Sequence, residues 1–540
     1  MIFRRVVVCA ISILASSSLA GAQHDEHPPA NPERLGNVRF ENSCAPTVAN
    51  DFNRAVALLH SFEFRSAMEG FTRVLERDPA CAMAHWGIAL CHWGNPFGGL
   101  KAGPPVERGA TAAEKASTTG TPTPRERGFI AAVAALYKDA STIPHRDRTL
   151  AYEQAMERLQ REYPTDIEAR MFYALAVSQT ALASDKTYAN QLKAGAILEP
   201  LFKQHPDHPG LAHYIIHAYD VPALAPKALA AARRYASIAP SAPHALHMPA
   251  HTFTRVGYWK ESIEANIASE KMSRQQNTLG EALHAMDYQT YAYLQLAQDR
   301  QALAARDRVE STLTKLDINA MGGAAPPLAG PFAAAAIYAR YALERGAWKE
   351  AAALQLRPSP FPFVDAITHF ARALGAARTG NPAAAKPDID QLTALRDKLA
   401  AAKDAYWTEQ VDIQRRIASA WMAFAEGRRD EGIAGLRAAA DAEDATDKSA
   451  VTPGPLAPAR ELLGYMLLEA GNAREARTAF DATMKKEPGR LRGLYGAARA
   501  AAADGDRAAA STYYKQLLEL ARDSGSDRAE LSEARKFLGR

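Results

Sequence analysis

The sequence predicts an all-α fold, in which about a dozen helical hairpins stack into one α-α superhelical solenoid. A unit of roughly 30 to 40 residues recurs along the chain. Alanine, leucine, arginine and glutamate, which favour helix, are abundant. Sequence patterns typical of strands are almost absent. Because each unit can bury its apolar face only against its neighbours, these observations together favour a solenoid over several separate domains.

The clearest units each predict two amphipathic helices with a glycine or polar residue at the turn and an alanine early in the second helix. Several units close on proline, as at Asp78-Pro79 and Glu487-Pro488, because proline cannot continue a helix. The clearest copies are residues 52–79, 211–240, 243–272, 459–488 and 491–522.

These units resemble the tetratricopeptide repeat (TPR) through their small, aromatic and proline positions. The matching positions are Ala67, Phe71 and Pro79; Ala228, Tyr235 and Pro240; and Ala476, Phe480 and Pro488. The segments 81–87, 213–220, 244–255 and 451–464 more narrowly resemble an uncharacterised group of exported bacterial TPR proteins. The resemblance implies a fold and a compartment, and it implies no reaction.

Residues 1–22 are typical of a secretory signal peptide. Arg4 and Arg5 precede the apolar run from Val6 to Leu14, and Ala20-Gly21-Ala22 offers a cleavage site. This predicts export to the periplasm of a bacterial host. No later run reaches about 18 apolar residues, so we expect no membrane insertion. Without the two arginines the formal charge of +4 falls to +2, and no basic stripe stands out, which disfavours nucleic acid as a partner.

Interruptions of the repeat pattern suggest how the mature chain is divided. The strongest one runs from Ala320 to Pro331 and contains Gly322-Gly323 and Pro326-Pro327. We therefore expect an N-terminal solenoid at residues 23–320 and a C-terminal solenoid at residues 331–540. The segment 451–455, Val-Thr-Pro-Gly-Pro, is interpreted as a rigid connection without a chemical role.

Three cysteines remain once Cys9 is removed with the signal peptide: Cys44, Cys81 and Cys91. In an oxidising compartment disulfides persist. Cys44 precedes the first repeat and Cys81 opens the second, so a Cys44–Cys81 disulfide would fix the irregular start of the mature chain. Cys91 is then expected to be a buried thiol.

Six of the fifteen histidines fall between His213 and His284. At 100° per residue, His213, His217 and Asp220 span about 60° of one predicted helix. On the next helix, His244, His247 and His251 span a similar arc. In the TPR family the first helix of each unit lines a concave groove, so the resemblance implies that both triplets face that groove.

Imidazole is a common ligand of zinc, copper and iron, and ligands four residues apart on a helix can close on one ion. The sequence therefore predicts a divalent transition-metal site, of unknown metal, in the groove. The predicted metal ligands are His213, His217, His247, His251 and Asp220. The residues predicted to orient these ligands or to contact substrate are His244, His284, Asp287, Tyr288 and Arg255.

Other hypotheses remain open at this stage. The groove of a periplasmic TPR adaptor would capture a peptide or protein partner without metal, whereas a metal site would admit a small molecule or peptide and could be catalytic. Tyr214 stands where HExxH would need glutamate, which disfavours a thermolysin-like peptidase. Seven other histidines are interpreted as surface or packing residues: His60, His85, His92, His145, His205, His208 and His369.

Overall fold

The computed structural model describes residues 33–540, except residues 100 and 320–322. The predicted signal peptide, residues 1–22, and the cleavage site lie outside the described residues. Leu35–Arg540 forms one compact unit. Within the described ranges this unit is built of helices joined by turns and loops, without a strand, which confirms the predicted all-α fold.

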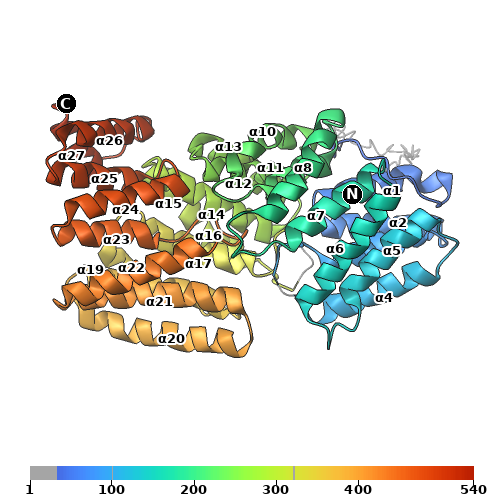
Figure 1. The fold of residues 1–540 in the computed structure, drawn as a ribbon, viewed down its shortest axis with the longest axis horizontal. Coiled ribbons are helices and arrows are strands. Elements are labelled where there is room, and N and C mark those ends of the chain that lie inside the picture. The colour runs from blue at the N-terminus through green and yellow to red at the C-terminus, as the bar shows by residue number, and fades with distance from the viewer. Residues whose placement is uncertain (1–32, 100, 320–322) are drawn as a thin grey trace, which may run out of the picture. The chain divides into compact units, whose positions relative to one another are not determined.

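The first part of the unit runs through helices α1 to α10, and consecutive helices pack together as pairs (Figure 1). Their bounds are α1 (Ala49–His60), α2 (Phe64–Arg77), α3 (Ala82–Trp93), α4 (Pro104–Thr118), α5 (Pro124–Tyr137), α6 (His145–Glu162), α7 (Ile167–Gln179), α8 (Ala189–Gln204), α9 (Pro209–Ala218) and α10 (Leu229–Ile238). Short 3-10 helices, η1 (Pro46–Val48) and η2 (Ala225–Ala228), precede α1 and α10.

The remaining helices continue the same pairing to the carboxyl end of the chain. They are α11 (Pro243–His247), α12 (Pro249–Arg255), α13 (Trp259–Gln275), α14 (Leu279–Gln295), α15 (Asp299–Asp307), α16 (Val309–Leu313), α17 (Ala329–Leu343), α18 (Trp348–Ala352), α19 (Pro362–Arg378), η3 (Pro382–Ala385), α20 (Lys386–Ala401), α21 (Ala405–Ala425), α22 (Arg429–Ala445), α23 (Ala459–Glu469), α24 (Ala473–Lys486), α25 (Leu491–Ala503), α26 (Arg507–Leu520) and α27 (Ala529–Phe537).

The aromatic position of the repeat shows how neighbouring helices interlock. The Phe480 ring on α24 packs against Gly464 on α23 and Gly496 on α25. A Cβ atom at Gly464 would lie 2.8 Å from that ring, and one at Gly496 only 2.3 Å. The two glycines are therefore required because the helices approach the ring too closely for a side chain.

Two large apolar cores form, and each includes a residue of the interruption predicted at residues 320–331. One joins residues from Leu35 to Phe253 together with Ala324, and the other joins residues from Ala329 to Ala500. Helix α14 packs against α17 across the interruption. The histidine-bearing helices α9 to α14 thus lie between the first core and the second, since α9 contributes to the first core and α14 packs on α17 of the second.

Cys44 and Cys81 form a disulfide that joins the segment before η1 to the start of α3, and Cys91 is a buried free thiol. Replacing both disulfide cysteines by serine is expected to lower the free energy of unfolding by about 4 kcal/mol, because the bridge restricts the unfolded chain over a separation of 37 residues. Urea denaturation measures this loss. Reductant should bring the wild-type midpoint down to that of the variant, and an unchanged midpoint after verified reduction would contradict the prediction.

Candidate metal centre

The six clustered histidines come from four short stretches of helix. His213 and His217 lie on α9, His244 and His247 on α11, His251 on α12 and His284 on α14. Five of them are buried, and His217 is partly buried. The structure thus brings together all six histidines of the region between residues 213 and 284.

The sequence analysis placed His244, His247 and His251 on one helix, and the structure divides that helix at Pro249. Pro249 has no N–H with which to bond the carbonyl four residues back. The backbone tightens instead, and the N–H of His251 donates to the carbonyl of Met248, three residues back, at 3.1 Å. Across this tight turn, the Nε2 atoms of His247 and His251 are 3.0 Å apart.

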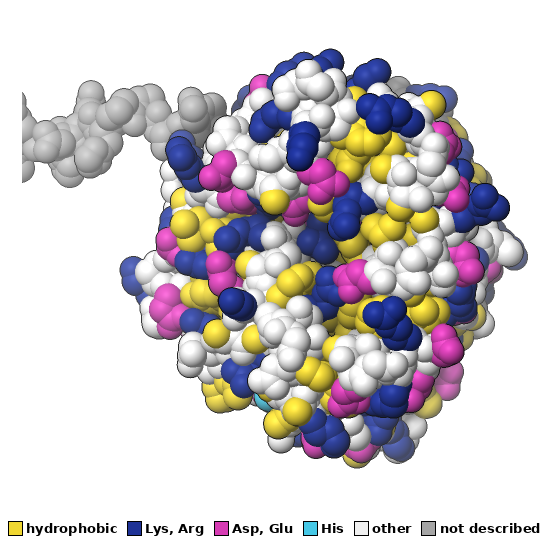
Figure 2. All heavy atoms as spheres, turned by 90° about the vertical axis from the view of Figure 1, so that its left-hand side faces the viewer, with side chains coloured by type: hydrophobic (Ala, Val, Ile, Leu, Met, Phe, Trp, Pro, Cys, Tyr) yellow, Lys and Arg dark blue, Asp and Glu magenta, His cyan; other side chains and the backbone are white. Residues whose placement is uncertain are grey.

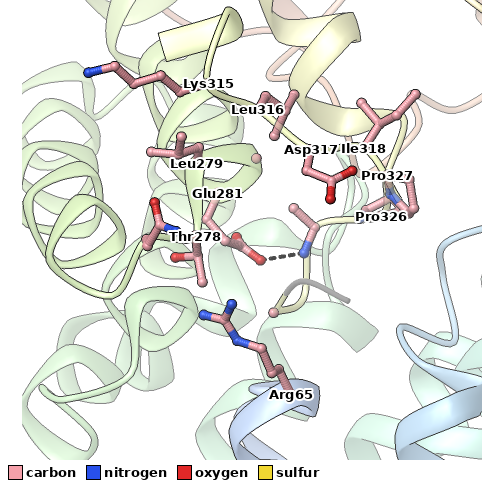
Figure 3. Close-up of a pocket in the computed structure, with 14 residues that line it drawn as sticks. Arg65, Thr278, Leu279, Glu281, Lys315, Leu316, Asp317, Ile318, Pro326 and Pro327 are labelled. Atoms are coloured by element: carbon pink, nitrogen blue, oxygen red, sulfur yellow. Dashed lines mark hydrogen bonds between the residues drawn. The ribbon is translucent and has the colours of Figure 1, made fainter. Parts of the chain in front are cut away.

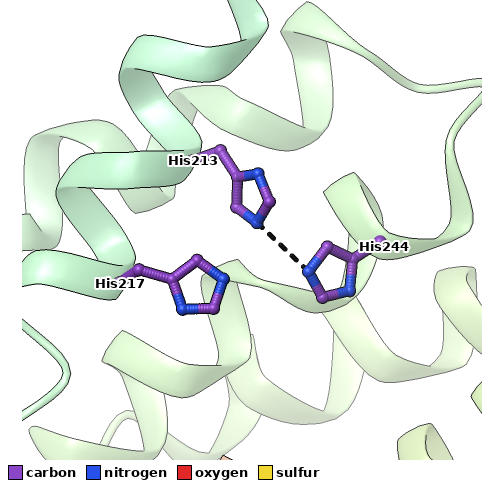
Figure 4. Close-up of side chains that lie close together, drawn as sticks. All are labelled: His213, His217 and His244. Atoms are coloured by element: carbon purple, nitrogen blue, oxygen red, sulfur yellow. Dashed lines mark hydrogen bonds between the residues drawn. The ribbon is translucent and has the colours of Figure 1, made fainter. Parts of the chain in front are cut away.

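The first group, here called triad A, consists of His213, His217 and His244 (Figure 4). One ring nitrogen from each lies within 4.8 Å of the others. The Nδ1 of His213 donates to the backbone oxygen of His60 at 2.6 Å, which leaves its Nε2 facing the Nε2 of His244 at 3.1 Å. The His217 ring stacks on Phe97, with 4.4 Å between ring centroids.

The second group, triad B, consists of His247, His251 and His284, again with ring nitrogens within 4.8 Å of one another. The Nδ1 of His247 lies 2.6 Å from Oδ1 of Asn266, whose amide nitrogen donates to the carbonyl of Ser262. The Nδ1 of His251 lies 2.8 Å from a carboxylate oxygen of Asp220. Both partners are acceptors, so both histidines carry their proton on Nδ1.

Several buried ring nitrogens in these triads have no hydrogen-bond partner. They are Nε2 of His217, Nδ1 of His244 and Nδ1 of His284. Buried polar atoms are nearly always paired in folded proteins. Each triad therefore contains at least one buried ring nitrogen that forms no hydrogen bond with another protein group.

Burial also determines the charge of the six rings. It is the largest cause that lowers the pKa of each ring. Other imidazoles lower the pKa further for five rings: His213, His217, His244, His247 and His284. For His251, Asp220 opposes the effect of burial, and Lys448 and Arg255 add to it. The pKa falls to about 3 for His213 and for His284. The rings are consequently neutral near pH 7, which is the form of imidazole that binds metals.

Asp220 connects triad B to two cations. Its carboxylate accepts from Nε of Arg255 at 2.9 Å and lies 3.3 Å from Nζ of Lys448. Burial acts to raise the pKa of Asp220, but Lys448, Arg255 and His251 together hold it well below its usual value. Burial lowers the pKa of Lys448 to about 8. Asp220 is thus an ionised group that orients His251 and is itself fixed by two basic side chains.

A segment far along the chain covers triad B. The hydroxyl of Tyr288 lies 3.3 Å from Nε2 of His251 and donates to the carbonyl of Thr452 at 3.2 Å. Arg340, on α17, holds this segment by donating to Thr452 and to the carbonyls of Gly454 and Pro455. The segment interpreted from the sequence as a rigid connection is therefore a cover over the histidines.

The predicted site residues are placed as follows. Four of the five predicted ligands are divided between the triads, two in each. The fifth, Asp220, is hydrogen-bonded to Nδ1 of His251 and belongs to neither triad. His244 and His284, predicted as supporting residues, complete the triads. Asp287 pairs with Arg340 at 2.9 Å. Asn266 and Lys448 were not predicted from the sequence: Asn266 lies on the next helix, α13, and Lys448 lies far along the chain, so neither shares a helix with the histidine motifs.

A pair of buried carboxyls lies beside triad A. Glu63 accepts from the backbone N–H of His244 at 3.1 Å, and Glu281 accepts from the backbone N–H of Ala325 in the pocket drawn in Figure 3. Burial raises the pKa of Glu63 to about 8, with Glu281 adding to the rise, and burial raises the pKa of Glu281 to about 7. The folded protein therefore holds protons here that the unfolded chain releases.

Glu281→Gln is expected to change the pH dependence of stability. Because the folded pKa of Glu281 lies above its unfolded value of about 4.5, its contribution is fully present below pH 4.5 and is lost as the pH rises through about 7. As the pH rises from 4.5 to 8, the free energy of unfolding of the metal-free variant should therefore increase relative to that of the metal-free wild type, by roughly 3 kcal/mol at most. Denaturant titrations at several pH values measure the difference, and parallel curves would contradict the assignment.

The surface side chains are less informative about function than the buried ones. On the face drawn in Figure 2, basic and acidic side chains are interspersed, and apolar side chains lie between them. Among the described residues, no helix is both long and apolar enough to cross a membrane.

No family model and no curated protein matches the sequence. Solved structures with detectable similarity include a tetratricopeptide repeat protein from Parabacteroides merdae, at 13% identity over 56% of this chain and 100% of that chain, with a TM-score of 0.29. A human IFIT1 dimer with m7Gppp-AAAA is 11% identical over 82% of this chain and 91% of that chain, with a TM-score of 0.39. Yeast Tom70 is 11% identical over 91% and 89%, with a TM-score of 0.29.

In this chain, consecutive helices pack as pairs. Glycines on neighbouring helices pack against the aromatic residue of a repeat, as at Phe480. The fold is TPR-like. The similarities above add nothing about a ligand or a reaction at the histidines.

Proposed function

We propose that this protein is an exported metal-binding protein that holds one transition-metal ion in triad A and one in triad B. The observation that carries the proposal is the contact between His247 and His251. Both rings donate through Nδ1, so two Nε2 lone pairs face each other at 3.0 Å. Two acceptors at this distance repel each other unless a cation lies between them or beside both.

A metal ion supplies that cation better than a proton does. A proton on either ring would create a buried imidazolium in a site that already contains the buried cations Lys448 and Arg255, matched by one Asp220 carboxylate. An ion bound to two or three nitrogens is held at about 2.0 to 2.1 Å from each. That bond length places neighbouring ligand atoms roughly 3.0 to 3.4 Å apart, and the Nε2 pairs of the two triads lie 3.0 and 3.1 Å apart.

The surroundings of the rings support the same role. In metalloproteins, a ligand histidine donates its other N–H to a carboxylate or a carbonyl, which fixes the ring and its tautomer. His213, His247 and His251 do so, to a backbone carbonyl, an amide oxygen and a carboxylate respectively. Six neutral nitrogen donors suit zinc, copper or iron, and a triad leaves a fourth position for water or a small ligand.

The alternative function is that of an adaptor that binds a peptide or protein on its TPR-like surface. The fold favours such a role. The histidines do not take part in it in this conformation, because five of the six are buried and the segment around Thr452 covers triad B. An adaptor surface and a closed metal centre can therefore occur in the same chain on different residues.

The test is elemental analysis of the mature protein, purified without a histidine tag. A His213→Ala/His247→Ala double variant should contain two metal ions per chain fewer than the wild type. His205→Ala is the matched control, because His205 is exposed, and its metal content should equal that of the wild type. Equal metal content in the wild type and a folded double variant would refute the proposal.

The exported location is proposed from the sequence features of residues 1–22. We expect the mature chain to begin near Gln23 and to be recovered from the periplasm. Amino-terminal sequencing of the protein purified from its host tests this, and an intact Met1 in that material would rule it out.

A further inference from the structure

A third cluster of metal-ligating side chains lies next to triad A. It consists of His60 at the end of α1, Glu168 in the first turn of α7 and His208 immediately before α9. All three are buried, and one ligand atom from each lies within 4.8 Å of the others. From the sequence, His60 and His208 were interpreted as surface or packing residues, as single histidines in helical repeats usually are.

Each imidazole meets a different oxygen of the same carboxylate. Nε2 of His60 lies 2.8 Å from Oε2 of Glu168, and Nε2 of His208 lies 3.1 Å from Oε1. The Nδ1 of His60 is hydrogen-bonded to the Tyr214 hydroxyl at 2.9 Å. These separations are close to the spacing of two ligands on one ion, which is roughly 3.0 to 3.4 Å for bonds near 2.1 Å.

The charge of the cluster is not balanced by the protein. Within 4 Å of the Glu168 carboxylate, the described residues supply only the two imidazoles and no lysine or arginine nitrogen. A buried carboxylate without a cation is costly, by several kcal/mol in typical proteins. The cluster therefore requires a positive charge, which is either an added proton or a metal ion.

A second histidine–carboxylate pair in the chain shows what a purely structural arrangement looks like. His369 lies 2.6 Å from Asp388, and Arg372 donates to both carboxylate oxygens at 3.1 Å. The arginine neutralises Asp388. Glu168 lacks such an arginine and has a second histidine in its place.

We propose that His60, His208 and Glu168 form a third metal site, which takes a divalent first-row transition ion between two imidazoles and one carboxylate. This donor set differs from the all-nitrogen triads, and two histidines with one carboxylate are well suited to zinc or iron(II). The ion would face both carboxylate oxygens and would neutralise the Glu168 charge.

The site has its own access and a direct connection to triad A. A pocket lined by Asp166, Glu168, His205 and His208 opens beside it at the starts of α7 and α9. On its other side, the backbone carbonyl of His60 accepts the N–H of His213, a triad A histidine. One residue, His60, thus supplies a ligand to the third site and orients a ligand of triad A.

The test measures zinc after equilibration of the untagged protein with zinc(II) and removal of unbound metal. Glu168→Gln, which keeps the shape of the side chain and removes its charge, should bind one zinc ion per chain fewer than the wild type. Asp388→Asn is the matched control at the arginine-neutralised pair and should bind as many as the wild type. Equal zinc content in the wild type and a folded Glu168→Gln variant would overturn the third site.

The same measurement in a triad-deficient background separates this proposal from the preceding one. The His213→Ala/His247→Ala protein should keep one zinc ion, and adding Glu168→Gln should remove it. If the double variant binds no zinc, the third site is ruled out and the triads are not. If the wild type binds only one zinc ion and Glu168→Gln loses it, the triads are ruled out and the third site is not. If Glu168→Gln does not fold, crystals of the zinc-loaded wild type provide the test. Anomalous scattering should show an ion among His60, Glu168 and His208. Anomalous peaks at the triads only would overturn the third site.

Discussion

A His247→Ala variant is expected to lose the ion of triad B and to keep the ion of triad A. His247 supplies one of the two apposed Nε2 atoms of triad B, and His213, His217 and His244 remain unchanged. Elemental analysis should therefore show one metal ion per chain fewer than in the wild type. The complementary variant His213→Ala should lose one ion as well, from triad A.

The thermal stability of the same proteins provides a second measurement. An ion that binds only the folded state stabilises it, by about 4 kcal/mol when its free concentration is a thousand times the dissociation constant. Added metal should therefore raise the melting temperature of the metal-free wild type more than that of His247→Ala. Equal increases in the two proteins would mean that His247 is not a ligand, even if the variant is less stable for reasons of packing.

An Arg340→Met variant is expected to destabilise the fold by about 3 to 5 kcal/mol. Arg340 and Asp287 are both fully buried and joined by a hydrogen bond of 2.9 Å, so the substitution would leave Asp287 without its cation. Burial already raises the pKa of Asp287 to about 6, even with Arg340 opposing that rise. Denaturant unfolding checks the prediction.

Arg345→Met serves as the control for Arg340→Met. Arg345 is partly exposed and pairs with the exposed Glu350, and pairs near the surface contribute about 1 kcal/mol or less. Arg340→Met should also release the segment that covers triad B, so that a chelator removes metal faster than from the wild type or from Arg345→Met. Unchanged chelation rates would show that Arg340 does not hold the cover closed.

The sequence was sufficient to predict the repeat architecture and the gathering of the histidines. Both depend on local periodicity, because residues three or four apart on a helix share a face and neighbouring repeats stack side by side. His213 and His217 on α9 converge with His244 in this way. The Cys44–Cys81 pairing likewise followed from the positions of the two cysteines at the start of successive repeats.

The division of the histidines into two triads could not be predicted, because it depends on contacts between different helices. The break at Pro249 and the tight turn after Met248 alter the direction of His251 by an amount that a regular helix does not indicate. Asn266, which accepts the N–H of His247, lies on a different helix, α13. Thr452, which accepts from Tyr288 beside triad B, lies more than a hundred residues further along the chain. Glu168 lies 108 residues from His60, and only the packing of α1, α7 and α9 brings them together.

Under the proposed function, the cover over triad B sets the order of metal binding and folding. The imidazoles come from residues 213–284, whereas Lys448 and Thr452, which close over them, belong to a much later part of the chain. In a chain that has assembled α9 to α14 but has not yet docked its last third, the triad B imidazoles are still uncovered. We therefore expect the metal available at that moment to be the one retained, since later exchange would require that region to unfold locally.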